Sequence, residues 1–571
     1  MALLVSNNVS AMATFSSFLN LESYDISRFP LAIVLTVAIG IGLMILLGRP
    51  GRKSERLLKG TEPPEVKTSI PLFGHLVGLW KEQFEYFQTL SSKNPLYPAF
   101  TLKIFAARIY VICEPAMIHA AYRNTKAFDF TRFIVDAGKN AFNVGERGMK
   151  IIRGETSPDY DPKGPFLNGN DGRSYLNESH KLMLEHLRPG GKLLELNRKV
   201  LAAVAESLNT LGQNAEKVSI FKWTRDNLTL ATTAALYGPQ DPVSADHSLI
   251  DSFWDFDNGL SMLMVGFLPT FMCSKASQGR AAIKNAFVSY YASSHHTAAS
   301  ALVKSRLECA QKWGLTVEEI SNIEISIIMV AAANSVPTAF WLLVYVLSDS
   351  SLISSIRTEI SHVISRNKVV DGIQECVMDI TLLQSRCPIL VSCFRETLRL
   401  TGAAAPVRYV AEDALLASST SSSPFLLKQG NIIQFPAGVT HKSPSIWGSN
   451  VESFDPYRFL PSTIAKLSKE QKKQQTQAYL PFGGGKHLCP GRQFATTEIL
   501  ALVGAIVMGF DVEGATVPEE AIQKLGVAVK KPKNDVEVNI RKRNGWENVR
   551  WRFDVQSEVD SDAFVREKND I

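Results

Sequence analysis

Cysteine is scarce in this chain of 571 residues, and its seven cysteines are odd in number and scattered between Cys113 and Cys489. No two of them form a CxxC pair, so the ligand spacing of a zinc finger or an iron–sulfur site is missing. A disulfide framework is equally disfavoured, which indicates a reducing compartment. A charge excess is also missing, because 61 Lys and Arg against 55 Asp and Glu leave a net charge of +6. That balance argues against a dedicated nucleic-acid binder.

Charged residues are missing from Leu31 to Gly48, a run of 18 mostly apolar residues near the N-terminus. Together with Phe29 and Pro30, a helix of this length spans a hydrocarbon core of ~30 Å. Basic residues follow the run and none forms a segment before it, which favours a retained anchor over a cleaved signal peptide or a buried core helix. We therefore predict a lumenal tail over 1–28, a transmembrane anchor over 29–48, and a single-pass membrane protein with the remainder of the chain in the cytosol.

We predict that residues 49–74 form a basic and Pro-rich hinge and that residues 75–571 form one large domain. Helical periodicity dominates from about 175 to 400, and the longest such run is Leu315–Ser348. Strand-like segments are short, as in Leu102–Val111 and Phe425–Phe435. No internal repeat of 20–50 residues is present. The predicted class is mainly α with small β-sheets.

A glycine-rich loop ending in a cysteine is the most informative segment, and it reads Phe482-Gly-Gly-Gly-Lys-His487-Leu-Cys489-Pro-Gly491. Three glycines permit a turn too tight for a β-carbon. A thiol beside cations, just before a predicted helix from about Arg492 to Phe510, is expected to ionise easily. A thiolate held by backbone donors suits an axial iron ligand. The alternative is a glycine-rich turn with a structural cysteine.

A second motif, Glu396-Thr-Leu-Arg399, lies in a helical run. Glu and Arg at i and i+3 share a face and can pair, although alone such a pair is commonly a solvated salt bridge. About 60 residues later comes Phe454-Asp-Pro-Tyr-Arg458-Phe, and the cysteine loop follows.

These three motifs, in this order, resemble those of the cytochrome P450 family, with His487 at the loop's basic position. The resemblance implies the cytochrome P450 fold and haem b, with Cys489 as the axial iron ligand and Phe482 at the start of the haem loop. It also implies that Glu396 and Arg399 lock onto Arg458. His487, Arg408 and His180 match residues that bind the haem propionates, with a surface histidine as the alternative for His180.

The predicted long helix departs from that family's pattern. Where most members carry an acid followed by threonine, this sequence has Asn334 and Ser335. An amide cannot titrate, so Asn334 cannot donate a proton, whereas Ser335 can hydrogen-bond oxygen. Pro337 removes one helical hydrogen bond and is expected to widen the helix. The variant resembles a branch with sterol 7α- and 12α-hydroxylases, prostacyclin synthase and fungal members.

The resemblance implies a monooxygenase acting on an apolar polycyclic substrate, such as a sterol, terpenoid or other secondary metabolite, with O2 and NADPH-derived electrons. The implied partners are NADPH–cytochrome P450 reductase, membrane lipid and a small apolar substrate, with no nucleic acid. The alternative is an isomerase or dehydratase that rearranges a peroxide without external electrons, and a third reading is a non-catalytic haem carrier. Apolar residues between about 215 and 300 are predicted to line the substrate pocket: Phe221, Phe253, Trp254, Phe256 and Leu260–Phe271.

Overall fold

The structure is a computed structural model of the whole chain. It describes residues 60–68, 74–104, 107–158, 160, 173–212, 215–264, 266, 273–367, 372–421, 423–522, 524 and 526–555. The predicted lumenal tail (1–28) and transmembrane anchor (29–48) lie outside these residues. Residues 60–68, at the end of the predicted hinge, form isolated bridges that join Thr61 to Phe425 and Glu65 to Thr101.

The described strands form four small sheets, as the sequence predicted. The largest has the order β1-β2-β10-β7-β3 and combines β1 (Ala99–Ile104), β2 (Ala107–Ile112), β3 (Phe128–Asp129), β7 (Val407–Val410) and β10 (Ile432–Gln434). Its β10–β2 pair is parallel, and its other pairs are antiparallel. The other three sheets contain β4 (Glu216–Ser219) with β11 (Phe510–Glu513) and β12 (Glu537–Lys542), β5 (Ile364–Arg366) with β6 (Gln374–Asp379) and β13 (Val549–Asp554), and β8 (Ala414–Leu416) with β9 (Phe425–Leu427).

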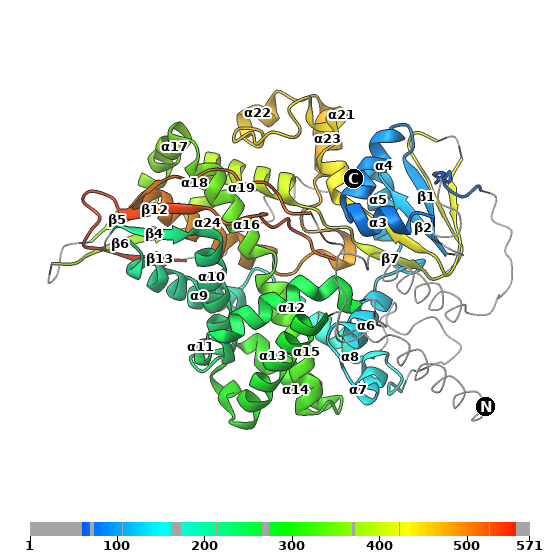
Figure 1. Ribbon diagram of the computed structural model, residues 1–571, viewed down its shortest axis with the longest axis horizontal. Helices are drawn as coiled ribbons and strands as arrows, with labels where there is room; N and C mark the ends of the chain where they lie inside the picture. Colours follow the sequence, from blue (N-terminus) through cyan, green and yellow to red (C-terminus); the bar gives the residue numbers. More distant parts are fainter. Residues whose placement is uncertain are drawn as a thin grey trace, which may run out of the picture.

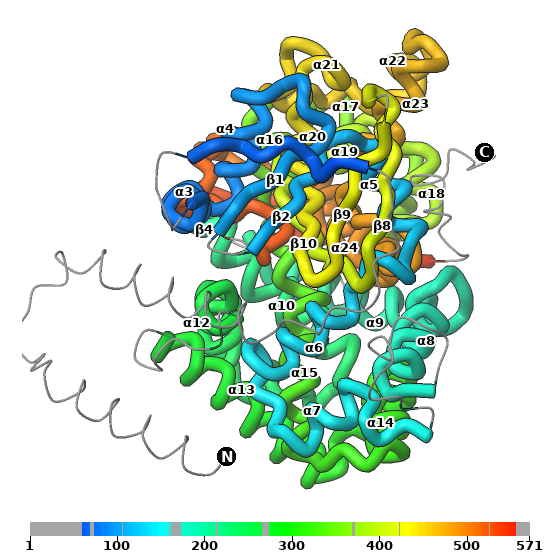
Figure 2. The backbone as a smooth tube through the Cα atoms, turned by 90° about the vertical axis from the view of Figure 1, so that its right-hand side faces the viewer, coloured from blue at the N-terminus to red at the C-terminus, as the bar shows by residue number. Residues whose placement is uncertain are grey.

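Helices fill the space between the β1–β2 sheet at one end of the long axis and the β4, β5, β6, β12 and β13 strands at the other (Figure 1). Figure 2 shows α8 and α12–α15 on the side opposite to the β1 sheet. The helices are α3 (Leu76–Glu82), α4 (Glu85–Lys93), α5 (Pro115–Arg123), α6 (Thr131–Asn140), α7 (Glu146–Ile152), α8 (Tyr175–Leu187), α9 (Gly191–Thr210), α10 (Ile220–Tyr237), α11 (Pro242–Ala245), α12 (Ser248–Met264), α13 (Ser274–Ala292), α14 (Ala301–Lys312), α15 (Val317–Ala332), α16 (Ser335–Leu347), α17 (Ser350–Ser361), α18 (Ile380–Arg386), α19 (Pro388–Thr401), α20 (Ala437–His441), α21 (Pro444–Trp447), α22 (Pro461–Ala465), α23 (Lys469–Ala478) and α24 (Arg492–Gly509).

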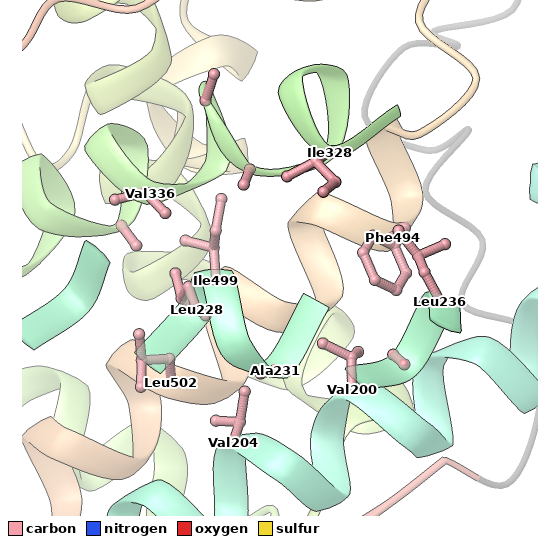
Figure 3. Close-up of a cluster of buried hydrophobic side chains, with 14 of the residues drawn as sticks. Val200, Val204, Leu228, Ala231, Leu236, Ile328, Val336, Phe494, Ile499 and Leu502 are labelled. Carbon is pink, nitrogen blue, oxygen red and sulfur yellow. The ribbon is translucent and has the colours of Figure 1, made fainter. Parts of the chain in front are cut away.

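The apolar core is centred on α9, α10, α15, α16 and α24. Figure 3 shows how their side chains meet, with Val200, Val204, Leu228, Ala231, Leu236, Ile328, Val336, Phe494, Ile499 and Leu502 labelled. Each fully buried aliphatic side chain of this kind contributes about 1.5–3 kcal/mol of transfer free energy. Val317–Leu347 is apolar and long enough to cross a membrane, but 78% of its most apolar window is buried inside the protein. The segment is therefore the central core helix that the sequence predicted.

The run Leu315–Ser348 is not one continuous helix, in line with the distortion that Pro337 was expected to cause. It is broken at Ala333 and Asn334, between α15 and α16. Pro337 explains the position of the break, since it has no N–H to donate to the carbonyl of Ala333 and its ring clashes with that carbonyl. The break thus lies one turn before the proline, and Asn334 and Ser335 sit on it.

Candidate active site

The glycine-rich loop holds Cys489 between α23 and α24. The Cys489 N–H donates to the Phe482 carbonyl at 3.0 Å, which closes the loop on itself. The backbone N–H groups of Gly491 and Arg492 hydrogen-bond the Cys489 sulfur, and the Arg492 guanidinium donates to the Cys489 carbonyl at 3.1 Å. The loop therefore presents one sulfur atom surrounded by backbone donors, the environment expected of a thiolate ligand.

The prediction that the Cys489 thiol ionises easily is wrong for the protein alone. Burial raises the pKa of the thiol, and this outweighs the opposing effects of the Gly491 and Arg492 N–H groups and of the Arg492 charge. Desolvation is the reason, because the charged sulfur loses its hydration and the backbone donors replace only part of it. A bound metal cation would favour the thiolate form of Cys489.

Two glycines of the loop adopt conformations that favour glycine, with φ +72° at Gly483 and φ +64° at Gly485. At Gly485 an added β-carbon would lie 2.7 Å from the backbone carbonyl oxygen of Tyr122, in α5. At Gly483 an added β-carbon would have no neighbour within 4 Å. The loop is thus pressed onto the end of α5 at Gly485.

We expect Gly485→Ala to destabilise the protein more than Gly483→Ala. Both variants place alanine in the left-handed region, at a cost of about 1–2 kcal/mol. Only Gly485→Ala adds a clash with a backbone atom, which no side-chain rotation relieves. The thermal unfolding midpoints of the two variants, compared with the wild type, measure the difference. Equal shifts in both would show that the contact with α5 does not matter.

The structure brings Glu396, Arg399 and Arg458 together in the interior. Arg399 donates to both carboxylate oxygens of Glu396, at 2.8 and 2.7 Å. The Nε of Arg458 donates to the same carboxylate at 3.0 Å. Glu396 and Arg399 are 0% exposed and Arg458 is 8% exposed, so two buried cations share one buried anion.

The same three side chains also hold backbone of the segment before the cysteine loop. Arg399 donates to the His441 carbonyl at 2.7 Å, and Arg458 donates to the Trp447 carbonyl at 2.7 Å. The Leu480 N–H in turn donates to the His441 ring at 2.9 Å. A chain of hydrogen bonds therefore runs from α19, through residues 441–458, to the start of the cysteine loop.

His487, His180 and Arg408 gather around Phe130. The rings of His180 and His487 lie 5.5 Å apart, the His487 ring lies 4.9 Å from that of Phe130, and the Arg408 guanidinium lies 4.5 Å from the Phe130 ring. Burial, followed by the neighbouring charges of Arg408, His180 and Lys486, lowers the pKa of His487 to about 3. Arg408 is 5% exposed and, among the described residues, forms no ion pair.

Among the described residues this basic cluster forms no salt bridge, and the nearest acidic charge that acts on it is Asp129, which opposes the lowering of the Arg408 pKa by burial. Buried cations are normally paired, and an Arg or His that converges with other bases is stabilised by a ligand carboxylate or phosphate. The donor set of Arg408, His487 and His180 therefore suits an anionic group held beside the cysteine loop.

Asn334 and Ser335 lie at the break between α15 and α16. The Asn334 side chain makes no capping hydrogen bond to α16, and the backbone carbonyl of Asn334 accepts from the Thr338 hydroxyl at 2.7 Å. Ser335 is 4% exposed, and its hydroxyl donates to the Ala331 carbonyl at 3.0 Å. The Ser335 and Thr338 hydroxyls thus donate hydrogen bonds to backbone carbonyls beside the break and stabilise the interruption between α15 and α16.

The predicted pocket lining is wrong for three residues. Phe253, Trp254 and Phe256 are 1%, 3% and 0% exposed and pack within the core. Phe221 packs edge-on against Trp254 and Phe340, at ring distances of 6.1 and 5.2 Å. Part of the range Leu260–Phe271 lies outside the described residues.

Val330 is an exposed apolar residue beside the break, and the sequence analysis did not identify it as part of the site. It is 55% exposed although it lies in the last turn of the apolar helix α15, between the buried residues Ile328 and Ala332. The apolar side of the α15–α16 break therefore faces an unfilled region rather than the core.

Sequence reasoning also missed Glu498, Tyr122 and Phe130. Tyr122 and Phe130 belong to no recognisable motif, and only the structure shows that the cysteine loop packs against them. Glu498 left a signal, since it is the one acid within the apolar sequence of α24.

Comparison with known proteins agrees with this arrangement. Residues 253–538 match the family described as "Cytochrome P450". A "Cytochrome P450 monooxygenase" of Gibberella zeae is 30% identical over 90% of this chain and 96% of its own length. The "7-alpha-hydroxycholest-4-en-3-one 12-alpha-hydroxylase" of Oryctolagus cuniculus is 25% identical over 89% of this chain and 99% of its own length. The structure of retinoic acid bound cyanobacterial CYP120A1 has a TM-score of 0.60 at 17% identity, covering 85% of this chain and 100% of that one.

The fold and these similarities define a haem-thiolate oxidoreductase of the monooxygenase class, with haem iron held by a cysteine thiolate. The chain belongs to the cytochrome P450 family. The residues present fit the cofactor, because a single cysteine sulfur lies among backbone donors and an unpaired basic cluster lies next to it.

Proposed function

We propose that the chain is a membrane-anchored monooxygenase that hydroxylates or oxidises an apolar polycyclic substrate. The observation that carries this proposal is Val330, an apolar side chain 55% exposed in the last turn of the mostly buried helix α15, one turn before Asn334 and Ser335. An apolar wall beside a few polar groups is the usual composition of a small-molecule site. The name of the Oryctolagus cuniculus relative favours a steroid as the substrate class.

Each residue has a defined task in this proposal. Cys489 would hold the haem iron through its sulfur, Phe482 fixes the loop through its carbonyl, and Arg408, His487 and His180 would bind the haem propionates. Glu396, Arg399 and Arg458 lock the segment that leads into the loop. When bound, the haem supplies the activation of dioxygen, and its thiolate ligand favours cleavage of the O–O bond. Asn334 and Ser335 orient oxygen or water at the helix break, while the apolar wall excludes bulk water.

The proposed cellular setting follows from the sequence. Residues 29–48 anchor the chain in the endoplasmic reticulum membrane, with 1–28 in the lumen, the hinge over 49–74 and the haem-thiolate domain over 75–571 in the cytosol. Electrons come from NADPH–cytochrome P450 reductase, and membrane lipid delivers the apolar substrate.

A second candidate function is an isomerase or dehydratase that rearranges a peroxide. The specific observation in its favour is Asn334, because an amide at the position of the usual acid cannot donate a proton. Rearrangement of a peroxide needs no electrons from outside, whereas hydroxylation needs two per turnover.

One experiment separates the two candidates. Membranes that contain the chain are incubated with 7-alpha-hydroxycholest-4-en-3-one and a panel of polycyclic terpenoids, with and without NADPH and reductase. We expect a substrate-induced spin shift for at least one compound, and an oxygenated product only when NADPH and reductase are both present. Product formation from a hydroperoxide without NADPH, and none with it, would contradict the monooxygenase proposal.

A further inference from the structure

The hairpin of β8 and β9 turns in a loop made of hydroxyl side chains. Residues 418–423 read Ser-Ser-Thr-Ser-Ser-Ser in the sequence. The structure describes all of them except residue 422, and Ser419, Thr420 and Ser423 are exposed to solvent. The loop has no apolar side chain with which to pack on the domain, so hydrogen bonds must hold it in place.

One carboxylate holds the start of this loop. Glu114 immediately precedes α5, but its side chain makes no capping hydrogen bond to that helix. Its Oε2 atom instead accepts from the Ser418 hydroxyl, and its Oε1 atom accepts from the Ser419 hydroxyl. Oε1 also accepts from the backbone N–H of Ser419 at 2.8 Å. Two neighbouring serines therefore supply three hydrogen bonds to one charged group.

The contact between Glu114 and the loop lies at one end of a packed unit. Leu416 of β8 and Leu427 of β9 share a buried apolar cluster with Tyr122 of α5, and Figure 2 shows the hairpin beside that helix. Tyr122 lies near the opposite end of α5, where an added β-carbon at Gly484 would be 2.7 Å from its ring. Helix α5 thus connects the serine loop with the cysteine loop.

Ser419 is the exposed member of the pair that Glu114 holds. Ser418 is half-buried, and its hydroxyl oxygen also accepts from the Thr420 N–H at 3.1 Å. A phosphoryl group on Ser419 would remove the hydrogen that its hydroxyl donates and would add about two negative charges at neutral pH. These charges would lie beside the Glu114 carboxylate, so an attractive contact would become a repulsive one.

We propose that Ser419 is a phosphorylation site and that Glu114 makes the modification release the loop from α5. The phosphoryl donor is a nucleoside triphosphate, and the catalyst is a serine/threonine kinase. The Ser419 Oγ atom bonds to the terminal phosphorus as the bond from that phosphorus to the bridging oxygen breaks. The nucleoside diphosphate leaves, the hydroxyl proton passes to water, and no electron is transferred. This site is independent of the reaction that the haem domain catalyses.

Mass spectrometry tests the site on the full-length chain, expressed in eukaryotic cells and isolated with its membranes. After proteolysis, the peptide that contains residues 418–423 should carry phosphate on Ser419, and treatment with a phosphatase should remove it. The Ser419→Ala variant should lack this phosphate. If the peptide is fully covered and carries no phosphate, or carries it only on another residue of the loop, the proposal is wrong.

Hydrogen exchange measures the release itself. In Ser419→Asp, the backbone N–H groups of residues 418–420 should exchange about tenfold or more faster than in the wild type, since a hydrogen bond to a charged group typically contributes this much. Combining Ser419→Asp with Glu114→Gln removes the repulsion between the two carboxylates. The double variant should therefore exchange at the rate of Glu114→Gln alone. Equal acceleration by Ser419→Asp in both backgrounds would show that Glu114 does not respond to the added charge.

The matched control is Ser423→Asp, which adds the same charge to the same loop. Ser423 is exposed as well, but in the part of the chain that the structure describes Glu114 accepts hydrogen bonds from Ser418 and Ser419 and not from Ser423. This variant should leave the exchange of residues 418–420 unchanged. Acceleration equal to that in Ser419→Asp would attribute both effects to the loop's net charge and would overturn the proposal.

Discussion

Cys489→Ala is expected to abolish the strongly red-shifted Soret band of the reduced carbon monoxide complex, together with all turnover. Only one sulfur lies among the backbone N–H groups of the loop, and no other described cysteine lies in a comparable environment. Burial raises the pKa of this thiol, so its charge must be stabilised by the iron that it binds. The spectrum of the variant in isolated membranes is the measurement.

The control for this experiment is Cys113→Ala, which alters a cysteine that follows β2 and is also half-buried. Cys113 lies far from the loop in sequence, and its thiol is kept neutral by burial, which raises its pKa to about 12. This variant should keep the red-shifted band. A red-shifted band in Cys489→Ala would disprove the ligand assignment.

Glu396→Gln is expected to yield little folded, haem-loaded protein. The change removes the one buried carboxylate that Arg399 and Arg458 share and leaves only the partly exposed Asp455, 3.9 Å from Arg458, and breaking a buried ion pair in this way costs about 3–5 kcal/mol. That is a large share of the stability of a typical domain, about 5–15 kcal/mol. Haem content per milligram of protein and the thermal unfolding midpoint measure the loss.

An exposed ion pair provides the matched comparison. Glu519 pairs with Lys533 at 2.7 Å, but both side chains are largely exposed to solvent. Glu519→Gln should leave haem content and the unfolding midpoint unchanged, because water screens such pairs. Normal haem loading in Glu396→Gln would mean that the three buried residues do not lock the segment before the loop.

The parts of the site that sequence reasoning located are those carried by short runs of neighbouring residues. Cys489 and its glycines form one loop, and Glu396 and Arg399 are one helical turn apart, so local geometry fixes how they act. The fold class followed from periodicity in the same way, and the predicted strands at Leu102–Val111 agree with β1 and β2.

The features of the site that could not be predicted from the sequence depend on tertiary packing. The sequence placed a widening at Pro337, but how completely the helix breaks depends on the hydroxyls of Ser335 and Thr338, which take up the freed carbonyls. The ionisation of Cys489 was misjudged because burial, which has no local sequence pattern, outweighs nearby N–H groups. The aromatic residues Phe253 and Phe256 were assigned to the pocket because composition alone does not separate a pocket wall from a core.

The order β1-β2-β10-β7-β3 determines when this protein can fold during its synthesis. The β2 strand is complete by Ile112, but its parallel neighbour β10 ends at Gln434. More than half of the chain must therefore leave the ribosome before the open side of β2 is covered, and such distant pairings form slowly. Until then β2 presents an unpaired edge to other chains. A message truncated between α19 and β10 would leave that edge exposed permanently, so its product is expected to aggregate or be degraded rather than accumulate as a partly active domain.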